Sequence, residues 1–143
     1  MMIEKYFILA MFIQATFPVF ILLKMLPMRL KALKRGDISA KYFKSYQSPD
    51  KEVPKELVII SRHYGNLFEM PMLFLILGTL LISLQLVSVS FLIAAWIYVF
   101  LRLIHTFIHL GSNRIMQRLT IFGLSCFVLL GMWIAFIGKI FLV

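Results

Sequence analysis

The chain alternates between long apolar runs and shorter polar connections. Four runs are long enough to cross the hydrocarbon core of a bilayer, which takes about 20 residues of helix. We predict membrane-spanning helices at roughly 3–28, 57–84, 88–111 and 114–141. The pattern therefore indicates an all-α fold, a four-helix integral membrane bundle that forms a single domain over residues 1–143.

The composition agrees with this pattern. Hydrophobic residues make up 62% of the chain, charged residues only 15%, and the mean hydropathy is +0.94. Soluble domains are about 45–50% apolar, so an ordinary soluble protein is excluded. The first run is too long for the apolar core of a signal peptide, and no small-residue cleavage site follows it, so we expect it to be retained as a span.

The connections between the runs carry the topology signal. The first, residues 29–56, holds eight Lys or Arg, the second ("SLQLVSVS") holds no charge, and the third ("GSNR") is a tight turn. The positive-inside rule then places the first and third connections in the cytoplasm and both termini on the opposite side. The net charge of +9 is read first as a topology signal, because so apolar a chain gathers most of its charge in the segments that leave the bilayer. Nucleic acid is not expected as a partner, because no basic helix face or soluble module is left to bind it.

Polar residues inside the spans gather on one face of each helix. The three sets are Arg62, Asn66 and Glu69; Arg102, His105 and His109; and Arg114 and Arg118. An ionisable side chain at the bilayer centre costs about 2.5–3.5 kcal/mol, so it requires a partner, a cavity or a function. At 1.5 Å per residue, Arg62, His105 and Arg118 all lie roughly 7–9 Å deep. We therefore expect the three sets to converge in the cytoplasmic half of the bilayer.

The turn between the third and fourth spans should bring their polar residues close together. Gly111 is expected to end the third helix, and Ser112 or Asn113 to cap the fourth. This hairpin holds His109 near the two arginines that open the fourth helix. The free N–H groups and the positive dipole end of that helix point to the same region, so an anion would be favoured there.

Two motifs resemble the MAPEG family, the membrane-associated proteins of eicosanoid and glutathione metabolism. The pattern RxxxNxxE of Arg62, Asn66 and Glu69, followed by Pro71, lies early in the second helix. The stretch "RLIHTFIHLGSNRIMQRL", residues 102–119, is similar to the same region of microsomal prostaglandin E synthase and microsomal glutathione transferase-type members. The resemblance covers the whole chain in topology and about 30 residues in motif.

The resemblance implies a homotrimer of four-helix subunits. Glutathione would be held between neighbouring subunits near the cytoplasmic face, and a lipophilic small molecule would enter from the bilayer lipids. By position in the motifs, Arg62, Asn66 and Glu69 would bind the charged ends and backbone of glutathione. His105 would line the site, and Arg118 would lie beside the thiol as the catalytic residue.

The chemistry of glutathione suits these residue types. It carries two carboxylates, which guanidinium groups bind in bidentate fashion, and one ammonium group, which needs an acid. Arg62, Arg102, Arg114 and Arg118 supply the donors, and Glu69 supplies the acid. A free thiol with a pKa of about 8.5 is mostly protonated at neutral pH, and a nearby arginine raises the thiolate fraction.

The sequence departs from the family pattern at three positions near this site. His109 and Phe122 stand where many members have tyrosine, and Leu119 follows Arg118 where some members have a hydroxyl. We expect His109 to replace the tyrosine as a hydrogen-bonding group. The expected activity is that of a transferase, peroxidase or isomerase that activates glutathione toward a lipophilic electrophile.

Plainer alternatives stay open for the polar residues. Glu69 and Arg102 could form a buried ion pair that only fixes helix register. His105 and His109 could simply hydrogen-bond between helices, or bind a metal ion through their HxxxH spacing, although no third ligand shares their face.

Two alternatives also stay open for the whole protein. The first is a binding protein on the same scaffold that performs no chemistry, which the missing tyrosine and hydroxyl allow. The second is a small four-helix transporter. Such exporters usually need a membrane-buried acid in the first helix, where this chain has only Glu4 near the end.

Overall fold

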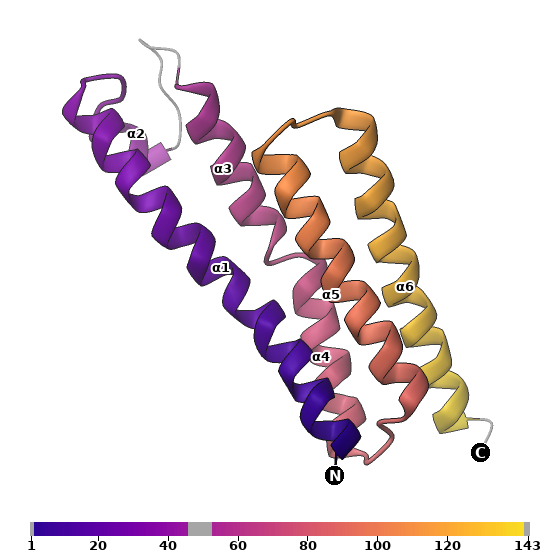
Figure 1. Ribbon diagram of the computed structural model, residues 1–143. Helices are drawn as coiled ribbons and strands as arrows, with labels where there is room; N and C mark the ends of the chain where they lie inside the picture. Colours follow the sequence, from indigo (N-terminus) through magenta and orange to yellow (C-terminus); the bar gives the residue numbers. More distant parts are fainter. Residues whose placement is uncertain (1, 46–52, 142–143) are drawn as a thin grey trace.

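The computed structural model describes residues 2–45 and 53–141, and within these ranges all regular structure is helical (Figure 1). In chain order the helices are α1 (Met2–Lys34), α2 (Tyr42–Ser45), α3 (Lys55–Asn66), α4 (Met70–Ser83), α5 (Val89–Leu110) and α6 (Ile115–Phe141). The long helices lie side by side as an elongated bundle. The prediction of an all-α fold is confirmed.

Four helical segments of the described chain are long and apolar enough to cross a membrane. They are Met2–Lys34, Lys55–Ser83, Val89–Leu110 and Ile115–Phe141. The second combines α3 and α4. The first has 33 residues, so it is roughly 50 Å long and exceeds a hydrocarbon core of about 30 Å. Its last turns, which contain Lys31 and Lys34, therefore extend beyond the apolar region.

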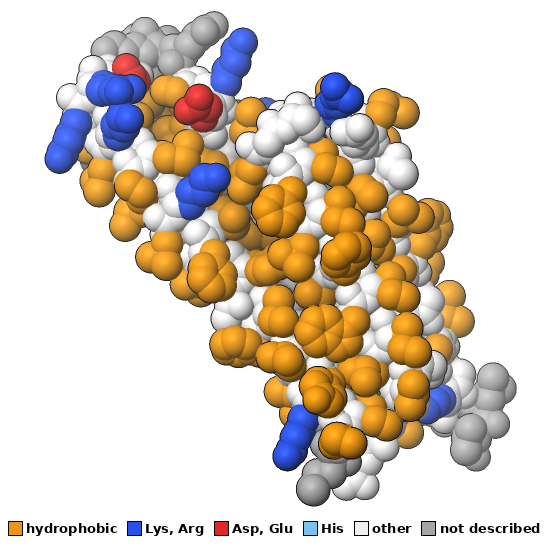
Figure 2. Space-filling view, viewed as in Figure 1, with side chains coloured by type: hydrophobic (Ala, Val, Ile, Leu, Met, Phe, Trp, Pro, Cys, Tyr) orange, Lys and Arg blue, Asp and Glu red, His pale blue; other side chains and the backbone are white. Residues whose placement is uncertain are grey.

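The outer surface of the bundle is apolar. Figure 2 shows hydrophobic side chains over the middle of the molecule, with lysines and arginines mostly near its two ends. Phe20 is 64% exposed and Phe127 is 73% exposed. Soluble monomers rarely expose continuous apolar patches of this kind, whereas lipid tails solvate them well. The surface therefore fits a bilayer.

The start of α1 and the end of α6 lie at one end of the bundle (Figure 1). Figure 1 places α2 and the α5–α6 connection at the opposite end, where the basic connection also begins. Part of that connection, residues 46–52, lies outside the described residues. The assignment of this end to the cytoplasm stays a prediction of the positive-inside rule.

The predicted second span, 57–84, contains a break at residues 67–69. Pro71 lies in the first turn of α4, has no N–H, and its ring would clash with the carbonyl of Leu67 in a continuous helix. The N–H of Leu67 donates instead to the Tyr64 carbonyl at 3.2 Å, which closes α3. Glu69 is therefore placed at the start of α4, beyond the end of α3.

The core below the break is packed by aromatic and small residues. The rings of Phe74 in α4 and Tyr98 in α5 stack at a centroid distance of 4.7 Å and an interplanar angle of 23°. At Gly78 an added Cβ would lie 2.6 Å from the sulfur of Met11, so α1 and α4 approach closely there. Such close contacts replace the hydrophobic effect as the source of helix association in lipid.

A second contact region ties α3 to α1 near the basic end. Arg29 of α1 donates a hydrogen bond from Nη2 to Ser61 Oγ at 3.4 Å, and its guanidinium lies 5.7 Å from the centroid of the Phe43 ring. Leu57 and Ile60 of α3 are both 2% exposed and pack in the same cluster. One face of α3 is thus fixed against α1, and its other face is left for the site.

Replacing Phe74 with alanine should destabilise the bundle. Phe74 is 0% exposed, and loss of a buried phenylalanine costs about 3–5 kcal/mol in soluble cores. We expect the apparent melting temperature in detergent to fall by roughly 5 °C or more. Phe100→Ala is the control, because Phe100 lies in α5 and is 62% exposed. Equal melting temperatures for the two variants would contradict this packing.

Candidate functional site

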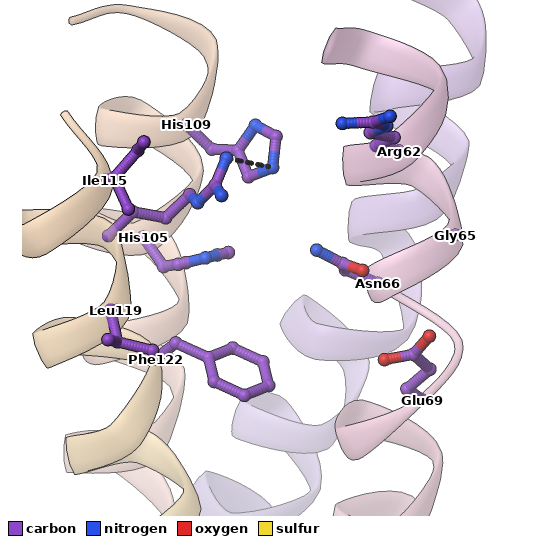
Figure 3. Close-up of a pocket in the computed structure, with 10 residues that line it drawn as sticks. Arg62, Gly65, Asn66, Glu69, His105, His109, Ile115, Leu119 and Phe122 are labelled. Atoms are coloured by element: carbon purple, nitrogen blue, oxygen red, sulfur yellow. Dashed lines mark hydrogen bonds between the residues drawn. The ribbon is translucent and has the colours of Figure 1, made fainter. Parts of the chain in front are cut away.

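A cavity of about 520 Å³ lies between α3 on one side and α5 and α6 on the other (Figure 3). Small-molecule sites typically measure about 300–1,000 Å³, so the volume suits a small ligand. The residues that line it are Arg62, Gly65, Asn66, Glu69, His105, His109, Ile115, Arg118, Leu119 and Phe122.

The α3 side of the cavity is polar. Arg62 and Asn66 point into the cavity, and Glu69 follows them just after the break before α4 (Figure 3). Arg62 and Glu69 are exposed, and neither forms a hydrogen bond or ion pair with any residue in the described part of the chain. One positive and one negative group are thus available to a ligand on the same wall.

Arg118 lies on the opposite wall and is held by two acceptors. Its Nη1 donates to Asn113 Oδ1 at 2.9 Å and to His109 Nε2 at 3.4 Å, the contact drawn as a dashed line in Figure 3. A guanidinium can only donate, so His109 Nε2 carries no hydrogen in this contact. Asn113, a candidate cap of the fourth helix by sequence, binds Arg118 with its side chain, and α6 begins at Ile115.

Three histidines pack together at the cavity: His105 and His109 line it, and His63, which sequence reasoning missed, does not. His63 of α3 is 0% exposed, and its ring centroid lies 4.9 Å from that of His109 and 5.7 Å from that of His105. The helical spacing of the sequence could have identified His63. It lies three residues after Ile60 and four before Leu67, so all three side chains share one face of the helix, and this face is buried.

The third imidazole does not turn the HxxxH pair into a metal centre. Within residues 2–45 and 53–141, no group of three or more His, Cys, Asp or Glu side chains has the geometry to hold a metal ion. Arg62 and Arg118 line the same cavity as His105 and His109, and two guanidinium groups repel a divalent cation. The charge of the site favours an anion.

Arg102, predicted to bind ligand, does not line the cavity. It is 0% exposed, and its Nη2 donates to the backbone carbonyl of Asn66 at 3.1 Å. Its guanidinium also lies 5.4 Å from the centroid of the Phe122 ring. No ion pair joins Arg102 to Glu69 among the described side chains, so the register-fixing ion pair is not observed.

Arg114 also lies apart from the other predicted site residues. It is exposed, it precedes α6, and its side chain is not among those that line the cavity. The structure therefore brings six of the predicted residues to one cavity, namely Arg62, Asn66, Glu69, His105, His109 and Arg118. Arg102 lies behind it and Arg114 outside it.

Apart from Arg118, the α6 side of the cavity is apolar. Ile115 is 69% exposed and Leu119 is 61% exposed, so this wall continues onto the outer surface of the bundle. Phe122 closes the lower part, with its ring centroid 5.6 Å from that of His105. The cavity thus joins a charged wall to an apolar opening, an arrangement that can bring together a polar and a lipophilic reactant.

The family comparison agrees with this geometry. The model of the MAPEG family matches residues 7–138, a range that includes every residue lining the cavity. Neither the curated proteins nor the solved structures gave a match. The chain therefore belongs to the MAPEG family and is an integral, multi-pass membrane protein of the group that serves glutathione and eicosanoid metabolism.

Proposed function

We propose that the protein is a membrane-embedded, glutathione-dependent transferase, peroxidase or isomerase that activates the glutathione thiol toward a lipophilic electrophile. One observation carries this proposal. The cavity sets unpaired Arg62 and Glu69 on one wall against Arg118 on the other, and it opens to the bilayer side through Ile115 and Leu119.

The α3 wall matches the charged ends of glutathione. The guanidinium of Arg62 can bind a carboxylate with two parallel hydrogen bonds, and the carboxylate of Glu69 can accept from the ammonium group. The Asn66 amide can both donate to and accept from a peptide group of the ligand. Together the three side chains recognise a zwitterionic peptide better than a simple anion.

Arg118 is the residue we assign to the thiol. A positive charge beside sulfur stabilises thiolate relative to thiol, and the effect is strong where apolar groups such as Leu119 and Phe122 exclude water. The thiol first loses its proton to solvent. The thiolate sulfur then forms a bond to the electrophilic atom while that atom's bond to its leaving group breaks, or a π bond breaks in an unsaturated acceptor. The displaced electron pair takes up a proton from solvent.

We further propose that the protein works as a homotrimer with the site toward the cytoplasm. The family resemblance supports this assembly, and the cavity is open enough for a neighbouring subunit to complete it. An added Cβ at Gly123 or Gly131 of α6 would meet no atom within 4 Å, so this helix has room for close approach by another helix.

A second candidate is a protein that binds glutathione or lipid without chemistry. Leu119 and Phe122 are the observation that favours it, because neither side chain offers a hydroxyl to assist the thiol. The two candidates differ in the ionisation of bound glutathione.

Bound glutathione should be partly ionised in the wild-type protein, visible as thiolate absorbance in the ultraviolet. Arg118→Ala should abolish this absorbance at neutral pH and keep most of the binding, because Arg62 and Glu69 still hold the peptide. Arg114→Ala is the charge-matched control, since Arg114 lies outside the cavity and its loss should leave the signal unchanged. Binding without any thiolate signal in the wild type would favour the second candidate.

Arg62→Ala and Glu69→Ala should each weaken glutathione binding by about tenfold or more, because hydrogen bonds to charged groups contribute about 1.5–3 kcal/mol. Calorimetry at millimolar glutathione measures the affinity, and the melting temperature without ligand checks the fold. We expect that temperature to stay close to the wild-type value, because both side chains are exposed. Variants that only unfold would assign these residues a structural role.

A further inference from the structure

The Arg118 side chain differs from the other cavity charges because it is already held in place. Arg62 and Glu69 have no hydrogen-bond or ion-pair partner in the described chain, whereas Arg118 has two, and both belong to residues outside α6. Asn113 lies in the turn before the helix, and His109 lies in the last turn of α5. The α5–α6 hairpin therefore sets the position of the guanidinium.

Asn113 is itself fixed by its backbone. Its φ of 47° lies in the left-handed region, which asparagine tolerates better than most residues. Its amide N–H donates to the carbonyl of Ile108 at 2.7 Å, which closes the C-terminal end of α5. The side-chain oxygen that accepts from Arg118 thus projects from a backbone anchored to α5.

His109 is fixed by packing. It is 2% exposed, and its ring lies against those of His63 at 4.9 Å and His105 at 5.6 Å. These neighbours leave the ring little room to turn, so Nε2 stays directed at Arg118. A neutral imidazole suits this place, because a third positive charge beside Arg62 and Arg118 would be unfavourable.

Arg118 donates both hydrogen bonds from Nη1. Among the described residues, no hydrogen bond uses its Nε or Nη2. The other donors of the planar group remain available to a ligand in the cavity. The side chain is therefore restrained before a ligand arrives and keeps donors for it.

We propose that Asn113 and His109 are positioning residues that hold the Arg118 guanidinium where it stabilises the glutathione thiolate. The inference rests on the proposed function. Loss of either acceptor leaves the charge of Arg118 in the protein but lets a flexible side chain move away from sulfur. The thiolate fraction then falls, while the peptide contacts on α3 are untouched.

The test is the pH midpoint of thiolate absorbance for glutathione bound to the purified full-length protein. Asn113→Gly removes the acceptor and keeps the turn, because glycine adopts positive φ readily. We expect the midpoint to rise by about one pH unit, a tenfold loss of thiolate at a fixed pH below it, with the dissociation constant changed less than about twofold. Ser112→Ala, an exposed neighbour in the same turn, is the control and should leave the midpoint unchanged.

His109→Phe provides an independent variant. It preserves an aromatic ring against His63 and removes the acceptor, and we expect a smaller rise because the 3.4 Å contact is longer than the 2.9 Å contact of Asn113. In an Arg118→Ala background, Asn113→Gly should shift the midpoint no further, since both act through one group.

The outcomes separate the two proposals. A wild-type thiolate signal that Asn113→Gly leaves unchanged would overturn the positioning role and leave the proposed function standing. An equal shift in the Arg118→Ala background would also overturn it, because Asn113 would then act by another route. A wild-type protein that binds glutathione only as the thiol would overturn both.

Discussion

The hydrogen bond from Arg102 to the carbonyl of Asn66 is the contact on which the site depends. Pro71 stops the helix that would otherwise run through the second span, and this leaves carbonyl groups at the end of α3 without helical partners. In lipid such groups cost several kcal/mol each. The buried Arg102 guanidinium donates a hydrogen bond to one of these carbonyls, and the negative end of the α3 dipole stabilises its positive charge. The bond thereby ties the end of α3 to α5, and with it the positions of Asn66 and Glu69.

The same arginine explains why the polar site can exist at membrane depth. Arg102 lies behind the cavity against Phe122, so its side chain takes up none of the cavity volume. Its charge adds to those of Arg62 and Arg118, so the region favours a negatively charged ligand. His63, His105 and His109 fill the space between α3 and α5 with packed rings. The packing of the rings and the charges of the arginines therefore both favour a negatively charged ligand.

Much of the fold, and six of the ten residues that line the cavity, could be predicted from the sequence. The four apolar runs and the helical spacing of their polar residues depend on hydropathy and period, both of which are local properties. The direction in which a side chain points in the folded bundle depends on the neighbouring helices and cannot be taken from the local sequence. Arg102 and His105 lie three residues apart, yet one faces the end of α3 and the other the cavity. The sequence offers Ser112 or Asn113 as the cap of the fourth helix, and only the folded hairpin shows that Asn113 binds Arg118.

The cavity joins its charged wall to an apolar side along Ile115 and Leu119, both of which are exposed on the outer surface. In the proposed reaction, a lipophilic reactant would reach a thiolate beside Arg118 by moving along this apolar side. Its tail would stay among the lipids, so the distance from Arg118 to the outer surface of α6 would decide how far from the tail the reactive atom has to lie.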